Sequence, residues 1–225
     1  MLLLALKQKT REINSMQLSK GKKITILIVA ILLIDQIVKI WIKTHMTLGE
    51  SIPVFGNWFQ IYFIENNGMA FGMQFGGTMG KLVLSLFRIA LAGFIVYYIN
   101  KLIKSGAPAG VLVGVSLILV GAIGNIFDSL FYGLLFSEST FTEVATTLPA
   151  GGGYAPFLFG RVVDMLYFPI IDTTLPDWFP VWGGEKFVFF RPIFNIADSC
   201  ITIGVIYMML FERKFFTSTS PSASA

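Results

Sequence analysis

Asparagine and aspartate recur at one spacing in two apolar stretches of this 225-residue chain. Asn125 and Asp128 lie three residues apart near the end of one stretch, and Asn195 and Asp198 repeat this spacing at the start of another. A third aspartate, Asp164, lies in the segment between them. An ionisable side chain at the centre of a bilayer costs at least about 2.5–3.5 kcal/mol on insertion scales, so these residues are candidates for function.

Two carboxylates that share a site of low dielectric constant do not readily ionise together, so one keeps a proton while the other is charged. Such a pair supplies a general acid and a general base at one pH. It can activate water against an amide without a covalent intermediate or a metal ion, while neighbouring Asn side chains orient the carboxylates or bind an extended peptide. The aspartates and asparagines therefore favour hydrolysis of a peptide bond.

Other catalytic centres find little support in the composition. The chain has one His, His45, and one Cys, Cys200, whereas zinc sites usually take several such ligands. We therefore expect neither a metal ion nor another cofactor. Ser85 and Lys81 are one helical turn apart, but no further group supports a serine–lysine pair, and no Gly-x-Ser-x-Gly elbow or phosphate-binding loop is present.

Asp35 and Lys39 lie four residues apart in the first apolar stretch. This spacing puts both side chains on one face of a helix, where they can neutralise each other. We interpret them as a structural ion pair that orients the helix. Arg88, alone in the second apolar stretch, has no assigned role.

The elements that must position these residues are expected to be membrane helices. Hydrophobic residues make up 55% of the chain and charged residues 13%, against about 25% charged residues in soluble domains. The apolar residues fall in long runs, and a helix needs about 20 residues to cross the hydrocarbon core. We predict an all-α membrane protein, a bundle of four transmembrane helices near Ile24–Ile42, Leu82–Ile99, Val111–Phe131 and Phe194–Phe211.

Lysine and arginine are concentrated before the first stretch, between the second and third, and after the fourth. By the positive-inside rule these segments and both termini are cytoplasmic, so the basic residues indicate topology and not nucleic-acid binding. The third helix then runs outward and the fourth inward. Both Asn-x-x-Asp pairs therefore lie at one depth near the outer face, where Asp164 joins them from a loop.

The chain is expected to form a single membrane domain. Residues 1–23 form a basic cytoplasmic segment, residues 24–215 the domain, and residues 216–225 a disordered cytoplasmic tail. An extracytoplasmic platform containing β-strands is predicted at about 48–77, because apolar and polar residues partly alternate there. A long outer loop is predicted at about 137–192, with Trp178, Phe179 and Trp182 at the level of the lipid headgroups.

The chain resembles the lipoprotein signal peptidases, or signal peptidase II, which are bacterial aspartic peptidases. Five short motifs occur in the order of that family over about residues 30–204. They are Asp35-Gln-Ile-Val-Lys39, Asn66-Asn-Gly68-Met-Ala70-Phe71, Gly121-Ala-Ile-Gly124-Asn125-Ile-Phe-Asp128, Val162-Val163-Asp164 and Phe194-Asn195-Ile-Ala197-Asp198. Each motif alone is weak, but five in order are specific.

The resemblance implies that Asp164 and Asp198 are the catalytic dyad. It implies that Asn66, Asn125 and Asn195, with Asp128, bind substrate or orient the aspartates. The family removes signal peptides from prolipoproteins by cleaving before a cysteine that carries diacylglycerol. The expected location is the bacterial cytoplasmic (inner) membrane, and the expected partners are these substrates, membrane lipids and a cyclic peptide inhibitor of the globomycin type. A monomer is expected.

Two features depart from the family. Ser129 follows Asp128 where the family usually has Arg, whose guanidinium could hold a peptide carbonyl. Either Arg161 or Arg191 supplies this group, or substrate binding differs. The segment between Asp128 and Asp164 is also longer than usual.

Two hypotheses from other classes remain open. One is a small proton or ion carrier that uses the buried Asp and Lys residues, although Val111–Val120 and Ile203–Leu210 carry no charge. The other is a non-catalytic membrane scaffold.

Overall fold

The computed structural model describes residues 19–68 and 77–218. Most of the predicted basic N-terminal segment lies outside the described residues. So do Met69, Ala70 and Phe71 of the second motif, the end of the predicted platform, and residues 219–225 of the predicted tail. Helix α7 (Arg213–Ser218) extends three residues into the segment predicted to be a disordered tail.

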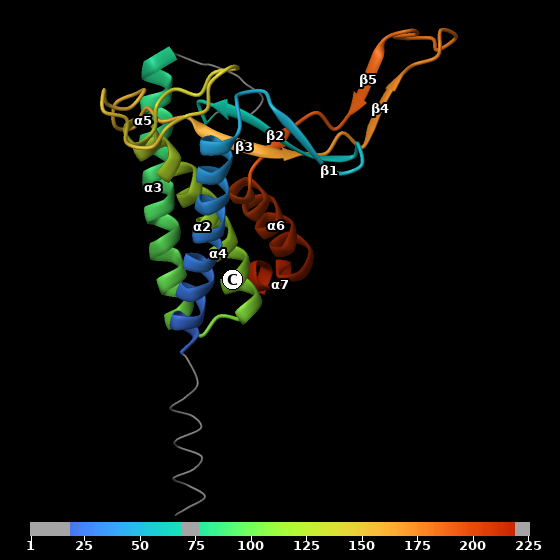
Figure 1. Cartoon of the computed structure of the whole chain (residues 1–225). Coiled ribbons are helices and arrows are strands. Elements are labelled where there is room, and N and C mark those ends of the chain that lie inside the picture. Colours follow the sequence, from blue (N-terminus) through green and yellow to red (C-terminus); the bar gives the residue numbers. More distant parts are fainter. Residues whose placement is uncertain (1–18, 69–76, 219–225) are drawn as a thin grey trace, which may run out of the picture.

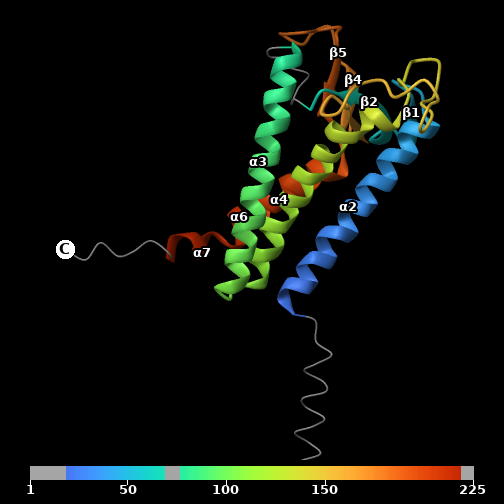
Figure 2. The same ribbon diagram turned by 90° about the vertical axis from the view of Figure 1, so that its left-hand side faces the viewer.

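Three helices of the described part are long and apolar enough to cross a membrane. They are α2 (Lys20–His45), α3 (Gly77–Lys104) and the helix Ala109–Leu135. The last consists of α4 (Ala109–Phe127), a π-helical turn η2 (Asp128–Tyr132) and α5 (Gly133–Leu135). Figure 1 shows α2, α3 and α4 running in the same general direction, and Figure 2 shows that α2 is inclined and diverges from α3 toward the end that carries the sheet.

The fourth predicted span is shorter than the other three. Helix α6 covers Ile196–Phe211, or 16 residues, which corresponds to about 24 Å against a hydrocarbon core of about 30 Å. Its start differs from the predicted Phe194 because Ile193–Phe194 form strand β6. Asn195 then caps the helix: its side chain accepts from the Asp198 N–H, and the Asp198 side chain accepts from the Asn195 N–H. This capping box fixes the first turn of α6.

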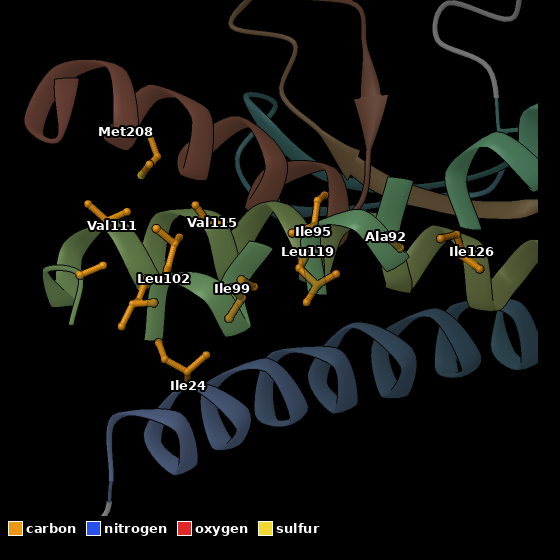
Figure 3. Packing of buried hydrophobic residues seen from close by; sticks show 12 residues of the cluster. Ile24, Ala92, Ile95, Ile99, Leu102, Val111, Val115, Leu119, Ile126 and Met208 are labelled. Atoms are coloured by element: carbon orange, nitrogen blue, oxygen red, sulfur yellow. The ribbon is translucent and has the colours of Figure 1, made fainter. Parts of the chain in front are cut away.

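Helix α4 is the centre of the bundle and packs against α2, α3 and α6. A cluster of buried apolar residues joins these helices; in Figure 3, Met208 of α6 points toward Val111 and Val115 of α4. Close approach depends on small residues. A side chain at Gly121 would collide with the carbonyl oxygen of Ala197 and with Ile201, so glycine lets the backbones of α4 and α6 meet.

A four-stranded antiparallel sheet lies at one end of the helices (Figure 1). Its order is β1 (Ser51–Phe55), β2 (Phe59–Asn66), β3 (Val162–Tyr167) and β6. The predicted platform thus contains β1 and β2, while the long outer loop contributes β3. A second apolar cluster, which includes Ile42, Phe63, Tyr132 and Met165, fixes the sheet to the ends of α2 and α4.

Strands β4 (Ile171–Thr174) and β5 (Lys186–Phe189) form a separate hairpin that projects from the sheet (Figure 1). The connection between them carries Trp178, Phe179 and Trp182, all exposed. It lies at the end of the hairpin remote from the helices. Their position at the level of the lipid headgroups remains a prediction.

Candidate active site

Asp164 projects from β3 away from the apolar cluster beneath the sheet. Successive strand residues point to opposite faces, and its neighbours Val163 and Met165 belong to that cluster. The Asp164 carboxylate is almost fully buried and has two amide donors. Asn195 Nδ2 donates to Oδ1 at 2.7 Å, and Asn66 Nδ2 donates to Oδ2. Antiparallel pairing of β2 with β3, in which Ile64 lies opposite Asp164, brings Asn66 into reach.

Asp198 is the third residue of α6, and the capping box holds its side chain at the helix start. Asn125 Nδ2 of α4 donates to Asp198 Oδ1 at 2.7 Å. Asn195 Nδ2 also lies 3.0 Å from Asn125 Oδ1. The two asparagines therefore link the carboxylates of Asp164 and Asp198, and the structure brings together the Asn-x-x-Asp pairs at the end of α4 and the start of α6.

Both carboxylates line one cavity of about 630 Å³. Asn66 and Asn125 line it with them, and Ile64, Val162, Ile193 and Phe194 provide an apolar wall. An apolar cavity with a few convergent polar groups is typical of a binding site. Asn195 does not line this cavity; its side chain is fully buried behind the two aspartates.

The environment of Asp164 favours its protonated form. Burial, together with the nearby charge of Asp198, raises the pKa of Asp164 to about 8. Lys39 and the hydrogen bonds from Asn195 and Asn66 oppose this rise. At neutral pH Asp164 therefore holds a proton beside a second carboxyl group, which is the arrangement that acid–base catalysis by two aspartates requires.

A fully buried ion network lies behind the cavity. Lys39 Nζ is 3.1 Å from Asp35 Oδ2 and 2.8 Å from Asp128 Oδ2, and it donates to Asn125 Oδ1 at 3.0 Å. The lysine thus contacts Asp128 as well as its predicted partner Asp35. Asp128 does not line the cavity, so its position suits orientation of the site and not contact with substrate.

The two network carboxylates hold the backbone beside each cavity aspartate. Asp35 Oδ1 accepts from the N–H of Ala197 at 3.0 Å, one residue before Asp198. Asp128 Oδ2 accepts from the N–H of Val163 at 3.3 Å, one residue before Asp164. Lys39 therefore holds Asp35 and Asp128 in place. These two carboxylates in turn hold the backbone beside Asp198 and beside Asp164.

Sequence reasoning missed Gln36 and the place of Arg88. Gln36 Nε2 donates to Asp35 Oδ2 at 3.1 Å and to Asp128 Oδ1 at 3.0 Å, so it completes the buried network. The sequence feature that could have identified Gln36 is its polar amide side chain, which lies next to Asp35 in an apolar stretch. Arg88 of α3 lines the cavity. A lone charged residue in an apolar stretch is a candidate for such a place.

The arginines proposed to replace the one absent at position 129 have different surroundings. Arg191 lines the cavity. Arg161 is engaged elsewhere, at 3.4 Å from Glu65 and 3.0 Å from Glu138. Ser129 Oγ donates to the carbonyl of Asn125 at 3.0 Å within its own helix.

The structure gives no support to a serine–lysine pair or to a metal site among the described residues. Lys81 Nζ donates to Asn67 Oδ1 at 3.1 Å and to the carbonyl of Phe159 at 2.8 Å. The Ser85 hydroxyl donates to the carbonyl of Lys81 at 2.9 Å, so the two side chains do not form a serine–lysine pair. Within residues 19–68 and 77–218, no three His, Cys, Asp or Glu side chains are grouped as ligands of a metal ion.

Comparison with known proteins shows the family of the chain. Residues 27–213 match the family model described as signal peptidase (SPase) II. A lipoprotein signal peptidase of Porphyromonas gingivalis is 52% identical over 195 residues, which cover 86% of this chain and 84% of that protein. One from Amoebophilus asiaticus is 38% identical over 183 residues, 80% of this chain and 73% of that protein.

The fold also has a counterpart among solved structures. A bacterial membrane enzyme solved at 2.3 Å by the in meso method superposes with a TM-score of 0.53 at 22% identity. The match covers 91% of this chain and 95% of that one. The apolar helices and these relatives make the chain a multi-pass membrane peptidase, and it belongs to the signal peptidase II family.

Proposed function

We propose that the chain is an aspartic endopeptidase that removes signal peptides from diacylglyceryl-modified prolipoproteins, cleaving before the lipid-bearing cysteine. The observation that carries the aspartic mechanism is the placement of Asp164 and Asp198 on one cavity, linked through Asn195 and Asn125. Among the described residues neither carboxylate forms an ion pair, whereas Asp35 and Asp128 both pair with Lys39. The dyad is therefore free to exchange protons.

In this mechanism Asp198 is the base and Asp164 the acid. Asp198 takes a proton from water, the water oxygen bonds to the scissile carbonyl carbon, and Asp164 gives its proton to the carbonyl oxygen. The tetrahedral diol then collapses. Asp164 takes back a hydroxyl proton, Asp198 gives its proton to the leaving nitrogen, and the C–N bond breaks. Both aspartates return to their initial states.

We further propose that residues 24–215 act as one domain with four membrane crossings in the bacterial inner membrane. Both termini are then cytoplasmic and the sheet lies at the outer face. Lys101 and Lys104 in the last turn of α3 support this orientation, since cytoplasmic loops are rich in such residues. The exposed apolar side chains of α2 and α3, such as Leu33, Ile37, Phe87 and Phe94, suit contact with lipid.

Substrate and inhibitor are proposed to use the same cavity. Asn66 and Asn125 can bind the backbone of an extended peptide beside the dyad, and a cyclic peptide of the globomycin type would compete for these groups. The enzyme is proposed to act as a monomer, since all the groups named above come from one chain.

Cleavage of a diacylglyceryl-modified precursor by the purified protein tests the proposal. Wild type should release the signal peptide, while Asp198→Asn should not. The matched control is Asp172→Asn, which alters an exposed aspartate on β4 and should cleave normally. Full activity of Asp198→Asn would refute the dyad. Proton flux into liposomes carrying the protein, with no cleavage, would favour the carrier hypothesis instead.

A further inference from the structure

Arg88 connects α3 to the site through the turn that ends β2. Its side chain is half-buried and lines the cavity that contains Asp164 and Asp198. The guanidinium Nη2 donates a hydrogen bond to the carbonyl oxygen of Gly68. Gly68 has φ +87°, a conformation that glycine adopts at little cost, so the turn after β2 can present this carbonyl to Arg88.

A chain of hydrogen bonds continues from this turn to Asp164. The N–H of Gly68 donates to Asn66 Oδ1, and Asn66 Nδ2 donates to Asp164 Oδ2. Both ends of the Asn66 amide are therefore engaged. The N–H of Gly68 holds the oxygen, which leaves the amino group to face the carboxyl group of Asp164.

Arg88 lies beside Ser129, the position at which the family usually has arginine. Arg88 and Ser129 line the same small recess between α3 and α4. Ser129 lies in η2, and its hydroxyl donates to the carbonyl of Asn125 in α4, so the cation on this side of the site comes from α3.

We propose that Arg88 is a positioning residue for the dyad. It holds the Asn66–Gly68 turn so that the Asn66 amide donates to Asp164. It thereby supplies a guanidinium at the cavity from α3, whereas the predicted sources of one were Arg161 and Arg191. The inference rests on the proposed role of Asp164 and adds a group that no motif of the sequence identified.

A double-mutant cycle with Asn66 tests the proposal, measured on cleavage of the lipid-modified precursor. Arg88→Met should lower kcat by up to about 100-fold, the scale expected for a misplaced catalytic group, and Arg88→Lys should lose less. Because Asn66 stabilises the charged form of Asp164, Arg88→Met should move the alkaline limb of the pH–rate profile to higher pH, as Asn66→Ala should. In the Asn66→Ala background, Arg88→Met should add little.

Several outcomes would overturn the proposal. These are wild-type kcat in Arg88→Met, an unmoved alkaline limb, or losses that multiply in the double variant. Lys101→Met, which removes an exposed cation from the same helix, is the control for expression and thermal midpoint. If Arg88→Met proves unstable, Arg88→Lys carries the same cycle. A wild-type protein that does not cleave would contradict the proposed function, whereas cleavage with normal Arg88 variants would contradict this inference alone.

Discussion

Two pairs of aspartates lie in neighbouring parts of this molecule in opposite electrostatic surroundings. Asp35 and Asp128 are fully buried and share the Lys39 ammonium. Asp164 and Asp198 line a cavity and receive amide hydrogen bonds instead of an ion pair. A buried charge needs a partner, whereas a catalytic acid needs a proton that it can give away. The difference indicates that Lys39 holds Asp35 and Asp128 in place, while Asp164 and Asp198 stay accessible from the cavity.

The two pairs are nevertheless mechanically linked. Asp35 binds the backbone next to Asp198, and Asp128 binds the backbone next to Asp164. Loss of an aspartate that lines the cavity should lower activity, whereas loss of the buried network should lower stability.

The largest effect is expected on activity from the dyad. Asp164→Asn should reduce kcat by about 10⁴-fold, since it removes the proton donor, while the thermal midpoint in detergent stays within a few degrees of wild type. Cleavage of the lipid-modified precursor and heat unfolding measure the two quantities. An Asp164→Asn variant with a much lower thermal midpoint but wild-type activity would contradict the difference drawn between the two pairs.

The buried network should respond in the opposite manner. Lys39→Met leaves two carboxylates without their cation, and breaking a buried pair costs about 3–5 kcal/mol. We expect a clear fall in the thermal midpoint and in the yield of folded protein. Adding Asp35→Asn and Asp128→Asn to this variant should recover part of the stability. Equal stability of Lys39→Met and wild type would show that the network is not structural.

The pH dependence of cleavage sharpens the comparison. The pKa of Asp164 is about 8, so the proton needed by the acid is present below that pH and lost above it. Because this pKa belongs to the protein without substrate, kcat/KM should fall as the pH rises through about 8. Asn66→Ala removes a hydrogen bond that lowers the pKa of Asp164, so the fall should move to higher pH. If the fall in activity moved to lower pH in Asn66→Ala, the titrating group would be one other than Asp164.

The smallest effect is expected outside both regions. Glu138 is 59% exposed and lies 3.0 Å from Arg161, and exposed pairs contribute at most about 1 kcal/mol. Glu138→Ala should leave kcat unchanged and alter the free energy of unfolding by less than that amount. Glu65→Ala should cost more, because Glu65 is buried against Lys43.

Local spacing predicted much of the site. The i, i+4 spacing of Asp35 and Lys39 predicted their contact, and opposite helix directions brought Asn125 and Asn195 to one depth. These inferences used neighbours in sequence or the direction of a helix, which apolar runs reveal. The predicted strand content of the platform was also found, in β1 and β2.

Contacts between distant segments could not be predicted in the same way. The Lys43–Glu65–Arg161 cluster joins α2, β2 and the segment before β3, and no periodic pattern encodes it. The start of α6 moved from Phe194 to Ile196 because β3 pairs with Ile193 and Phe194. The partner of Arg88 depends on a left-handed glycine at position 68, which the composition alone does not specify.

The π-helical turn η2 constrains the number of residues between Asp128 and α5. Such a turn accommodates one residue more than a regular α-helical turn, and here it lies between Asp128 and α5. Removing one residue from it would turn everything that follows by about 100° around the helix axis and draw it back by about 1.5 Å. Asn125 and Asp128 would stay in place while the departure point of the outer loop rotated. Residue number, more than residue type, is therefore constrained at this point.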